Sequence, residues 1–263
     1  MILDEIVRHK KHEITELKNT YPLDKLKDDL QRFEPPRDFK KALVKCSSTK
    51  NNKLINIIAE VKKASPSKGI IRDDFNPVEI AKTYEENGAI AISVLTDKKY
   101  FQGDTEYLKQ IKATTSIPIL NKDFIIDPYQ IYQARVFGAD AVLLIAAIMK
   151  DDELSDYLDL SSQLGLHALV EVHTLKELKR VLSTNAQIIG INNRDLKSFN
   201  VNTNKSIQLA KHIPDTKTVV SESGIDNKEL ILKLQEIGID AFLIGEALMK
   251  EKDYGKKLRE LLN

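Results

Sequence analysis

An acid and a base leave one predicted strand on the same side near the start of the chain. The apolar run Ile57-Ile58-Ala59 leads into Glu60 and, two residues later, Lys62. Because side chains alternate across a strand, Glu60 and Lys62 share a face. Burying such a pair costs desolvation energy, so it is either a structural salt bridge or part of an acid–base site. The loop at 65–69 reads Ser-Pro-Ser-Lys-Gly, and its amides and hydroxyls can hold an anion.

Charged and polar residues also follow most of the other short apolar runs. Six of eight predicted strands end in such residues, which are Glu60 and Lys62, Lys122, Glu171, Asn192 and Arg194, Glu222 with Ser223 and Gly224, and Gly245 with Glu246. One buried charge is easily structural. Groups that converge from six strand ends instead indicate an active site.

Eight apolar runs bounded by turn residues are the elements that must position these groups. They are Ile55–Val61, Ala89–Leu95, Ile117–Leu120, Ala139–Ile145, His167–Val172, Ile188–Ile191, Thr218–Ser221 and Ala241–Ile244. Helical patterns separate them, and a final helical stretch runs from Glu246 to Leu262. Strands that are apolar on both faces are typical of a parallel sheet covered by helices.

An internal repeat favours a closed barrel over an open sheet. Gly88, Gly138 and Gly238 each end a helical pattern just before a strand, and the sequence after them is similar. This spacing fits one βα unit per roughly 25 residues. No G-x-G-x-x-G turn of a doubly wound sheet is present. We therefore predict a TIM (β/α)8 barrel forming a single domain over 1–263, with an N-terminal helical extension at 1–47 and the barrel at 48–263.

The N-terminal extension has its own helical pattern. Ile2, Leu3, Ile6 and Val7 recur at helical spacing, Tyr21-Pro22 breaks the pattern, and a second helix is expected over Leu23–Phe33. We interpret the extension chiefly as a plug over one barrel end. A contribution to the active site is the alternative, and the sequence does not say which end is covered.

The composition narrows the class of protein. The chain is 30% charged with a net charge of +1, which points to neither nucleic acid nor a membrane as partner. No apolar run reaches transmembrane length and the first residues do not resemble a secretory signal, so we expect a cytoplasmic protein. The single Cys46 and five scattered histidines make no metal-binding motif. We expect no metal and no other cofactor.

The residue types at the strand ends suggest chemistry on a phosphorylated substrate. Ser223-Gly224 and Gly245-Glu246 close the last two strands, where barrels often bind phosphate, and Ser65 could close over the same anion. The lysines and glutamates suit proton transfers on a sugar phosphate. They equally suit a lysine Schiff base on a carbonyl substrate, and residue chemistry alone leaves both open.

A family resemblance extends over the whole chain. The blocks that carry it are Ala59–Ser67, Leu120-Asn121-Lys122-Asp123-Phe124, Leu169–Val172, Ile191-Asn192-Asn193-Arg194-Asp195-Leu196, Ser221–Ile225 and Leu243–Met249. In order and spacing they resemble the indole-3-glycerol-phosphate synthase family, as does the aromatic loop at 100–103. Ala247 departs from the expected small polar residue, which removes a side-chain contact to phosphate but leaves the backbone amides.

The resemblance implies a lyase of tryptophan biosynthesis. Its substrate, 1-(2-carboxyphenylamino)-1-deoxyribulose 5-phosphate, closes its ring and loses carbon dioxide and water. By analogy Lys122 protonates the C2 carbonyl oxygen, Lys62 pairs with the substrate carboxylate and is a second candidate acid, and Glu171 assists dehydration. Glu60 and Asn192 hold this network, and Glu222 is a further candidate catalytic residue.

Candidate substrate-binding residues follow from the same resemblance. Phe101, Phe124, Leu144 and Leu196 are expected to pack the anthranilate ring, although a plain core position is an open alternative for each. Arg194, Ser65, Ser223, Gly224, Gly245 and Glu246 complete the predicted set.

Two rival functions stay open at this point: a Schiff-base aldolase using Lys122 or Lys62, and a silent barrel that binds a phosphorylated metabolite. We expect a monomer in transient contact with other enzymes of the pathway.

Overall fold

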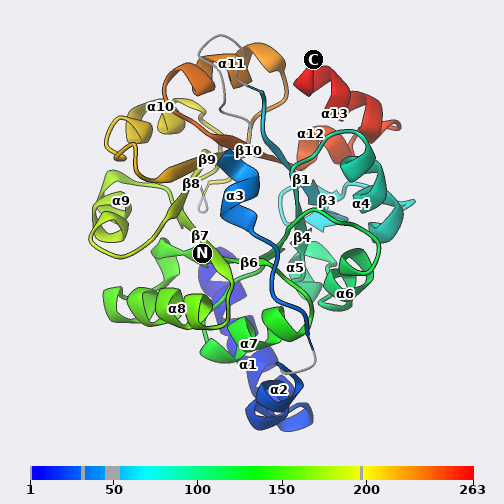
Figure 1. The fold of residues 1–263 in the computed structure, drawn as a ribbon, viewed down its shortest axis with the longest axis vertical. Helices are drawn as coiled ribbons and strands as arrows, with labels where there is room; N and C mark the ends of the chain where they lie inside the picture. Colours follow the sequence, from blue (N-terminus) through cyan, green and yellow to red (C-terminus); the bar gives the residue numbers. More distant parts are fainter. Residues whose placement is uncertain (1, 31–32, 45–53, 196–197) are drawn as a thin grey trace.

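A closed barrel of parallel strands forms the centre of the structure (Figure 1). The computed structural model describes residues 2–30, 33–44, 54–195 and 198–263. The eight strands follow one another around the barrel in the order β1-β10-β9-β8-β7-β6-β5-β4, and β4 pairs with β1 to close it. Each strand pairs in parallel with its neighbours, so all the strand C-termini open at one end. The predicted (β/α)8 barrel is confirmed.

The predicted strands lie within two residues of the observed ones at each end. The bounds are β1 Ile57–Val61, β4 Ala91–Leu95, β5 Ile119–Lys122, β6 Ala141–Ile145, β7 His167–Val172, β8 Ile188–Asn192, β9 Thr218–Glu222 and β10 Ala241–Ile244. Lys122, Asn192 and Glu222 are therefore the last residues of their strands. A short antiparallel hairpin, β2 Ala64–Ser65 and β3 Gly69–Ile70, follows β1 and was not predicted.

Helices surround the barrel, and several of them begin at a polar capping residue. The surrounding helices are α4 Pro77–Glu86, α6 Glu106–Lys112, α7 Pro128–Val136, α8 Asp151–Gln163, α9 Leu175–Leu182, α10 Asn204–Ala210, α11 Lys228–Glu236 and α13 Tyr254–Leu262. Asn76, Asp127 and Asn227 accept hydrogen bonds from the first-turn amides of α4, α7 and α11. The repeated glycines before the strands do adopt positive φ, of 93° to 97°.

The alternation of strand side chains separates an outer core from the barrel interior. On β1, Ile57, Ala59 and Val61 pack outward against the helices, whereas Ile58 packs inside the barrel. Glu60 lies two residues beyond Ile58 and so points inward as well. The expectation that Glu60 and Lys62 share a face is confirmed by their ion pair.

The final helical stretch is interrupted, contrary to the sequence pattern. It consists of α12 Glu246–Met249 and α13, with a break at 250–253. The carbonyls of Met249 and Glu251 turn away to accept hydrogen bonds from Arg72 Nη1, at 3.2 and 2.8 Å. Asp253 then caps α13 by accepting from the Lys256 amide. The Arg72 hydrogen bonds lie at the end of α12 and the Asp253 cap lies at the start of α13. The structure therefore has two helices where the apolar spacing predicted one.

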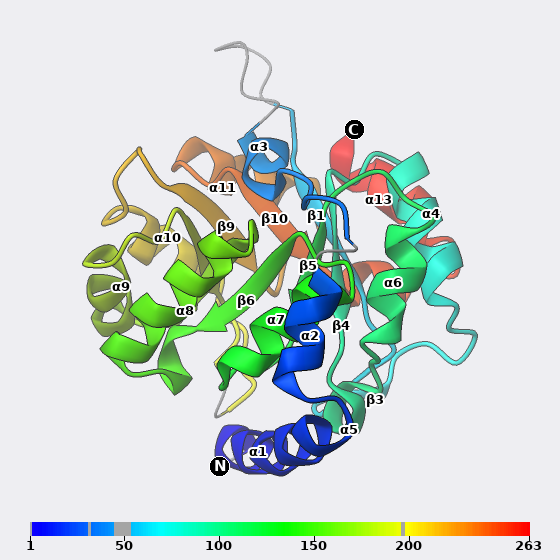
Figure 2. The same cartoon turned by 60° about the horizontal axis from the view of Figure 1, so that its bottom comes forward.

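The N-terminal extension covers both ends of the barrel. Its helices are α1 Ile2–Thr20, α2 Leu23–Asp29 and α3 Phe39–Val44, of which α3 was not predicted and α2 ends before the expected Phe33. Figure 2 shows α1 and α3 at opposite ends, with the barrel between them. Phe39 and Leu43 of α3 pack inside the barrel at its N-terminal end. The proposed boundary at 47 lies outside the described residues.

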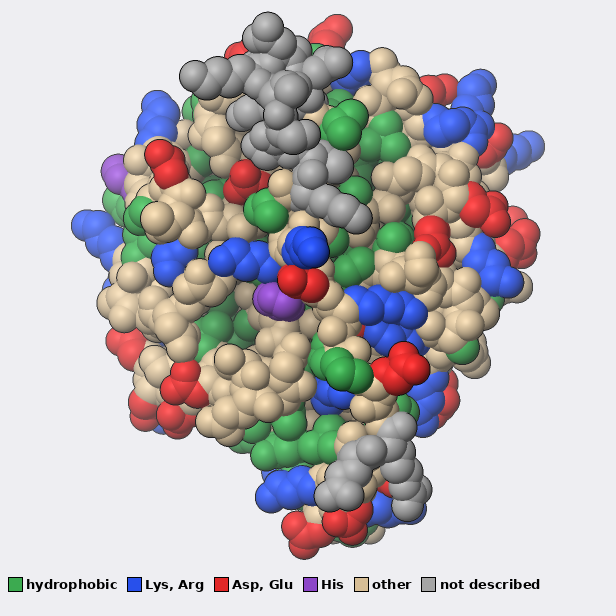
Figure 3. All heavy atoms as spheres, in the orientation of Figure 1, with side chains coloured by type: hydrophobic (Ala, Val, Ile, Leu, Met, Phe, Trp, Pro, Cys, Tyr) green, Lys and Arg blue, Asp and Glu red, His purple; other side chains and the backbone are tan. Residues whose placement is uncertain are grey.

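The surface carries both signs of charge. Figure 3 shows Lys and Arg interspersed with Asp and Glu over the face that α3 covers, with no large area of one sign. Among the helices that the structure describes, none is both long and apolar enough to cross a bilayer.

Candidate active site

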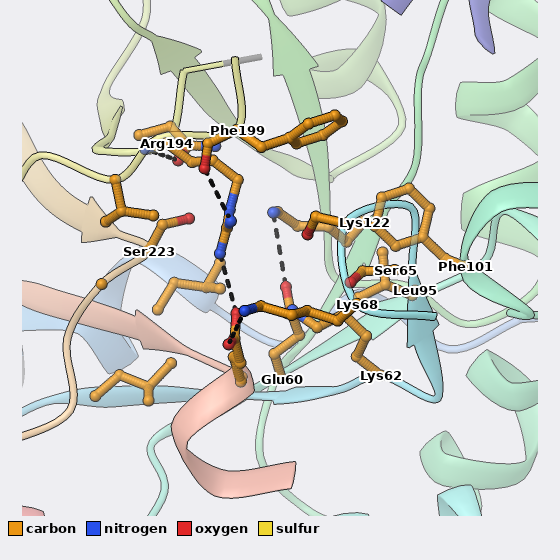
Figure 4. Close-up of a pocket in the computed structure, with 18 of the residues that line it drawn as sticks. Glu60, Lys62, Ser65, Lys68, Leu95, Phe101, Lys122, Arg194, Phe199 and Ser223 are labelled. Atoms are coloured by element: carbon orange, nitrogen blue, oxygen red, sulfur yellow. Dashed lines mark hydrogen bonds and ion pairs between the residues drawn. The ribbon is translucent and has the colours of Figure 1, made fainter. Parts of the chain in front are cut away.

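A cavity of about 660 Å³ opens at the C-terminal end of the barrel. Its lining includes thirteen of the predicted site residues, which are Glu60, Lys62, Ser65, Phe101, Lys122, Phe124, Glu171, Asn192, Arg194, Ser223, Gly224, Gly245 and Glu246. Figure 4 shows Arg194 and Ser223 on one side of the Glu60–Lys122 pair, with Phe101 and Leu95 on the other. The cavity therefore has a polar side and an aromatic side.

Two lysines and two glutamates form an ion-paired cluster at the base of the cavity. Lys62 Nζ lies 2.5 Å from Glu60 Oε1, and Lys122 Nζ lies 3.6 Å from Glu60 Oε2. Lys122 Nζ also lies 3.4 Å from Glu222 Oε2. Glu222 is almost fully buried and does not itself line the cavity, but it contacts Lys122, which does.

The cluster shifts the pKa values of three of its members. Burial opposes ionisation of Glu60, but Lys62 and Lys122 outweigh it and lower the pKa of that carboxyl. Burial likewise favours a neutral Lys122, but Glu222, Glu60 and Glu171 raise its pKa above the ordinary value. For Glu222 burial wins: despite Lys122, desolvation and the neighbouring Glu171 raise its pKa to about 7. The cluster thus contains a stable ammonium beside a carboxyl that can hold a proton near neutral pH.

Two glycines, one within a strand and one directly after a strand, provide the space for these carboxylates. A Cβ on Gly190, in β8, would collide with Oε1 of Glu222. A Cβ on Gly245, directly after β10, would collide with Oε1 of Glu60 and would also lie 3.0 Å from its Cβ. Gly245 was predicted as a phosphate-binding residue, and the structure gives it this second role. The carboxylates can approach the barrel axis because the neighbouring strands lack side chains there.

Glu171 has partners on two sides. Asn192 Nδ2 donates to Glu171 Oε2 at 3.1 Å. On the other side, His173 Nε2 lies 3.3 Å from Glu171 Oε1, and its Nδ1 lies 3.5 Å from Glu177. Burial would lower the pKa of His173, but Glu177 and Glu171 raise it. His173 follows Glu171 by two residues in the sequence, so alternation along the strand puts both side chains on the same face.

The polar side of the cavity is rich in cations. Arg194 Nη2 lies 3.1 Å from Glu246 Oε2, while Lys250 and Lys68 lie 2.5 and 3.9 Å from Glu246 Oε1. Burial favours a neutral Glu246, but the three cations together lower the pKa of the carboxyl. Ser223 and Gly224 beside them have φ of 67° and 76°, so the chain turns sharply there. Glu246 thus neutralises cations that face the cavity.

The aromatic side agrees with only part of the predicted set. The rings of Phe101 and Phe124 lie 6.0 Å apart. Leu144 does not line the cavity, because its side chain points outward into the helix-covered core, and its neighbours Leu143 and Ile145 point inward instead. Leu196 lies outside the described residues.

Several cavity residues were missed by reasoning from the sequence. Phe199 lines the cavity from the loop after β8, and its φ of 59° is not a local sequence signal. Ile2, Leu3 and Ile6 line it from α1. Their helical spacing was visible, but which end of the barrel they cover was not. Within the described ranges, no group of three or more His, Cys, Asp or Glu side chains is placed to hold a metal ion.

Comparison with known proteins identifies the family. The family model described as indole-3-glycerol phosphate synthase matches residues 3–261. The chain belongs to the indole-3-glycerol phosphate synthase family. An indole-3-glycerol phosphate synthase from Alkaliphilus metalliredigens is 49% identical over 99% of this chain and 98% of that protein. One from Campylobacter jejuni strain RM1221 is 48% identical over the full length of both.

Solved structures with low sequence identity share the fold alone. An N-acetylmannosamine-6-phosphate 2-epimerase from Clostridium perfringens is 17% identical, with a TM-score of 0.55 over 73% of this chain and 86% of that chain. Thiamine phosphate pyrophosphorylase from Pyrococcus furiosus is 18% identical, with a TM-score of 0.57 over 80% of this chain and 94% of that chain.

Membership of the indole-3-glycerol phosphate synthase family confirms the resemblance found in the motifs. The same membership confirms the predicted function, which is that of a carboxy-lyase of tryptophan biosynthesis that forms indole-3-glycerol phosphate.

Proposed function

We propose that the cavity binds 1-(2-carboxyphenylamino)-1-deoxyribulose 5-phosphate and that Lys122 is the general acid for ring closure. The observation that carries this assignment is the position of Lys122 between Glu222 and Glu60, at 3.4 and 3.6 Å, on the cavity floor. Carbon–carbon bond formation at C2 places negative charge on the carbonyl oxygen. An ammonium that donates a proton there stabilises that charge as it develops.

Lys62 orients the carboxylate of the substrate in this proposal. Its ammonium lines the cavity and is anchored by Glu60 at 2.5 Å. The ring carbon that bears the carboxylate attacks C2, and the ring is then no longer aromatic. Loss of carbon dioxide returns the electron pair to the ring and restores aromaticity. No metal or other cofactor takes part in the proposed steps.

Dehydration is assigned to the Glu171 side of the cavity. Glu171 accepts the proton that the substrate loses. Asn192 Nδ2 lies 3.1 Å from Oε2 of Glu171, and His173 Nε2 lies 3.3 Å from its Oε1, so both carboxylate oxygens are held in place. The C2 hydroxyl leaves as water after taking a proton from a lysine ammonium. Lys122 and Lys62 both line the cavity and are the two candidates for this second transfer.

Glu222 supplies the proton that Lys122 loses. With a pKa of about 7 and a distance of 3.4 Å, Glu222 can be protonated at working pH and return a proton to the lysine. Because the two groups are in direct contact, this exchange does not need an intervening water molecule.

The two sides of the cavity hold the two ends of the substrate. Ser223, Gly224 and the amides after Gly245 are proposed to bind the phosphate, with Arg194, Lys68 and Ser65 close by on the cavity wall. The anthranilate ring packs on the opposite side against Phe101 and Phe124. This orientation puts the reacting C2 atom over Lys122.

A turnover assay that follows indole fluorescence tests the assignment, with borohydride added to one sample. Lys122 in its ammonium form does not attack carbon, so we expect turnover and no covalent sugar adduct by mass spectrometry. A trapped adduct on Lys122 would replace the acid–base mechanism with a Schiff-base mechanism.

We further propose that the protein is a cytoplasmic monomer that contacts other enzymes of the pathway transiently. Analytical ultracentrifugation with and without those enzymes tests the monomeric state and the contacts.

A further inference from the structure

A buried lysine on α1 contacts the barrel beside the active site. The side chain of Lys10 is 2% exposed, although α1 lies on the outside of the barrel mouth. Its Nζ lies 2.9 Å from Asp97 Oδ2 and 3.0 Å from Asp123 Oδ1. The third partner, Glu13 on the same helix, lies 2.8 Å away. Lysines on surface helices ordinarily extend into water, so this arrangement has a specific cause.

Lys10 keeps its charge in this position. Burial alone would lower the pKa of the Lys10 ammonium, but Asp123, Asp97 and Glu13 raise it above the ordinary value. Asp97 is fully buried, so without Lys10 its carboxylate would face no cation at this distance among the described residues. Lys10, Asp97 and Asp123 are therefore held together by electrostatic attraction in a region of low dielectric constant.

Asp123 connects Lys10 to Lys122. It directly follows Lys122 and accepts from the Phe124 amide through Oδ1, at 2.7 Å. Its Oδ2 accepts from Thr96 Oγ1 at 2.5 Å, and the Thr96 amide in turn donates to the Lys122 carbonyl at 3.3 Å. The carboxylate that binds Lys10 thus also orders the segment that follows the proposed general acid and connects it to Thr96, directly after β4.

Asp97 connects Lys10 to the aromatic loop. Its Oδ1 caps the short helix α5, Lys98–Phe101, by accepting from the Tyr100 amide at 2.7 Å. Tyr100 also contacts α1, where its hydroxyl donates to Glu5 at 3.1 Å and its ring lies 5.9 Å from that of His9. The next residue is Phe101, which lines the cavity. Figure 2 shows α1 and α5 at the same end of the barrel.

We propose that Lys10 is a positioning residue for the reaction, which holds α1 closed on the mouth and fixes Asp97 and Asp123, and through them Phe101 and Lys122. One helix thereby places its own Ile2, Leu3 and Ile6 against the cavity and orders two strand-end loops. The inference rests on the proposed role of Lys122 as general acid.

The test compares Lys10→Met with two control variants at temperatures well below their melting transitions. We expect kcat/KM to fall at least about tenfold in Lys10→Met, with a decrease in kcat, because small displacements of a catalytic group reduce rates strongly. Lys11→Met removes an exposed charge from the same helix, and Glu13→Gln removes the one ion pair of Lys10 that does not reach the barrel. Both controls should retain kcat and KM within about twofold. Lys10→Arg, which keeps the charge, should recover most of the lost kcat.

Two results would overturn the proposal: unchanged kcat and KM in folded Lys10→Met, whether or not its Tm is lower, or an equal loss of activity in Glu13→Gln. If Lys10→Met fails to fold, Asp97→Asn cuts the same bridge while its Oδ1 still caps α5, and the same kinetic criteria apply. Lys122→Met is measured in parallel. An active Lys122→Met would contradict the proposed mechanism, whereas an inactive one beside a fully active Lys10→Met would contradict only the role of Lys10.

Discussion

Lys122 and Glu222 face each other from opposite sides of the barrel, at the ends of β5 and β9, with Nζ and Oε2 3.4 Å apart. The pair combines a lysine whose pKa is raised with a carboxyl whose pKa is raised to about 7. The relationship places a charged proton donor directly beside a group that can resupply its proton.

Removal of either proposed acid–base group should reduce turnover without unfolding the protein. We expect Lys122→Met and Glu171→Gln each to lower kcat by roughly 10²-fold or more. Lys82→Met and Glu86→Gln on the outer face of α4 change the same residue types at exposed positions and should behave as the wild type. Steady-state kinetics and circular dichroism of all four variants provide the check. Near-native turnover in Lys122→Met or Glu171→Gln would remove that residue from the mechanism.

The pH dependence of kcat should report on Glu222. Because the protonated carboxyl resupplies Lys122, we expect kcat to fall as the pH rises through about 7, where Glu222 loses its proton. Glu222→Gln does not titrate, so the remaining activity should lose this limb of the profile. An identical limb in Glu222→Gln would assign it to another group.

The same pKa shift has a definite sign for stability. The pKa of Glu222 is raised from 4.5 to about 7 in the folded protein, so between these values the folded state binds more protons than the unfolded state. The free energy of unfolding should therefore decrease as the pH rises over this interval, and this slope should be smaller in Glu222→Gln. Urea unfolding at several pH values measures it. Equal slopes in the two proteins would show that Glu222 is not the responsible group.

Removal of the Glu246 carboxylate should strengthen substrate binding. Glu246 pairs with Arg194, Lys250 and Lys68 at the proposed phosphate end of the cavity, where a phosphate would compete for the same cations. We expect Glu246→Gln to lower KM by roughly two- to fivefold, the range for partly exposed ion pairs. Glu260→Gln, an exposed acid on α13, serves as the control. A higher KM in Glu246→Gln would instead indicate that the carboxylate contacts the substrate favourably.

The opposite end of the barrel should affect stability and not catalysis. Leu43 of α3 is fully buried under the barrel, and its carbonyl accepts from Asn56 Nδ2 at 2.8 Å. Leu43→Ala should lower the free energy of unfolding by about 2–5 kcal/mol through lost burial and a cavity. Well below the transition, kcat and KM should not change. The neighbouring Val44 is 41% exposed, so Val44→Ala is the matched control. A KM shift in Leu43→Ala would show that the two barrel ends are coupled.

Local sequence patterns were sufficient for the eight barrel strands to within two residues, but not for the β2–β3 hairpin, α3 or the break before α13. Alternation along β1 placed Glu60 and Lys62 on one face, and eight apolar runs with helices between them predicted the barrel. The same rule, applied to Leu144, would have directed it outward, as the structure does. These features depend on the side-chain period of two residues in a strand and of about four residues in a helix. Both periods can be read directly from the spacing of apolar residues in the sequence.

Closure of the barrel decided the relationships that local patterns do not contain. Only closure brings Glu222 beside Lys122, and with it comes the burial that raises the pKa of Glu222. The side on which α1 packs was equally absent from the sequence pattern, because an amphipathic helix can cover either end of a barrel. In the folded protein Lys10 of α1 meets Asp97 and Asp123 at the C-terminal end, where the two carboxylates offset the cost of burying its ammonium.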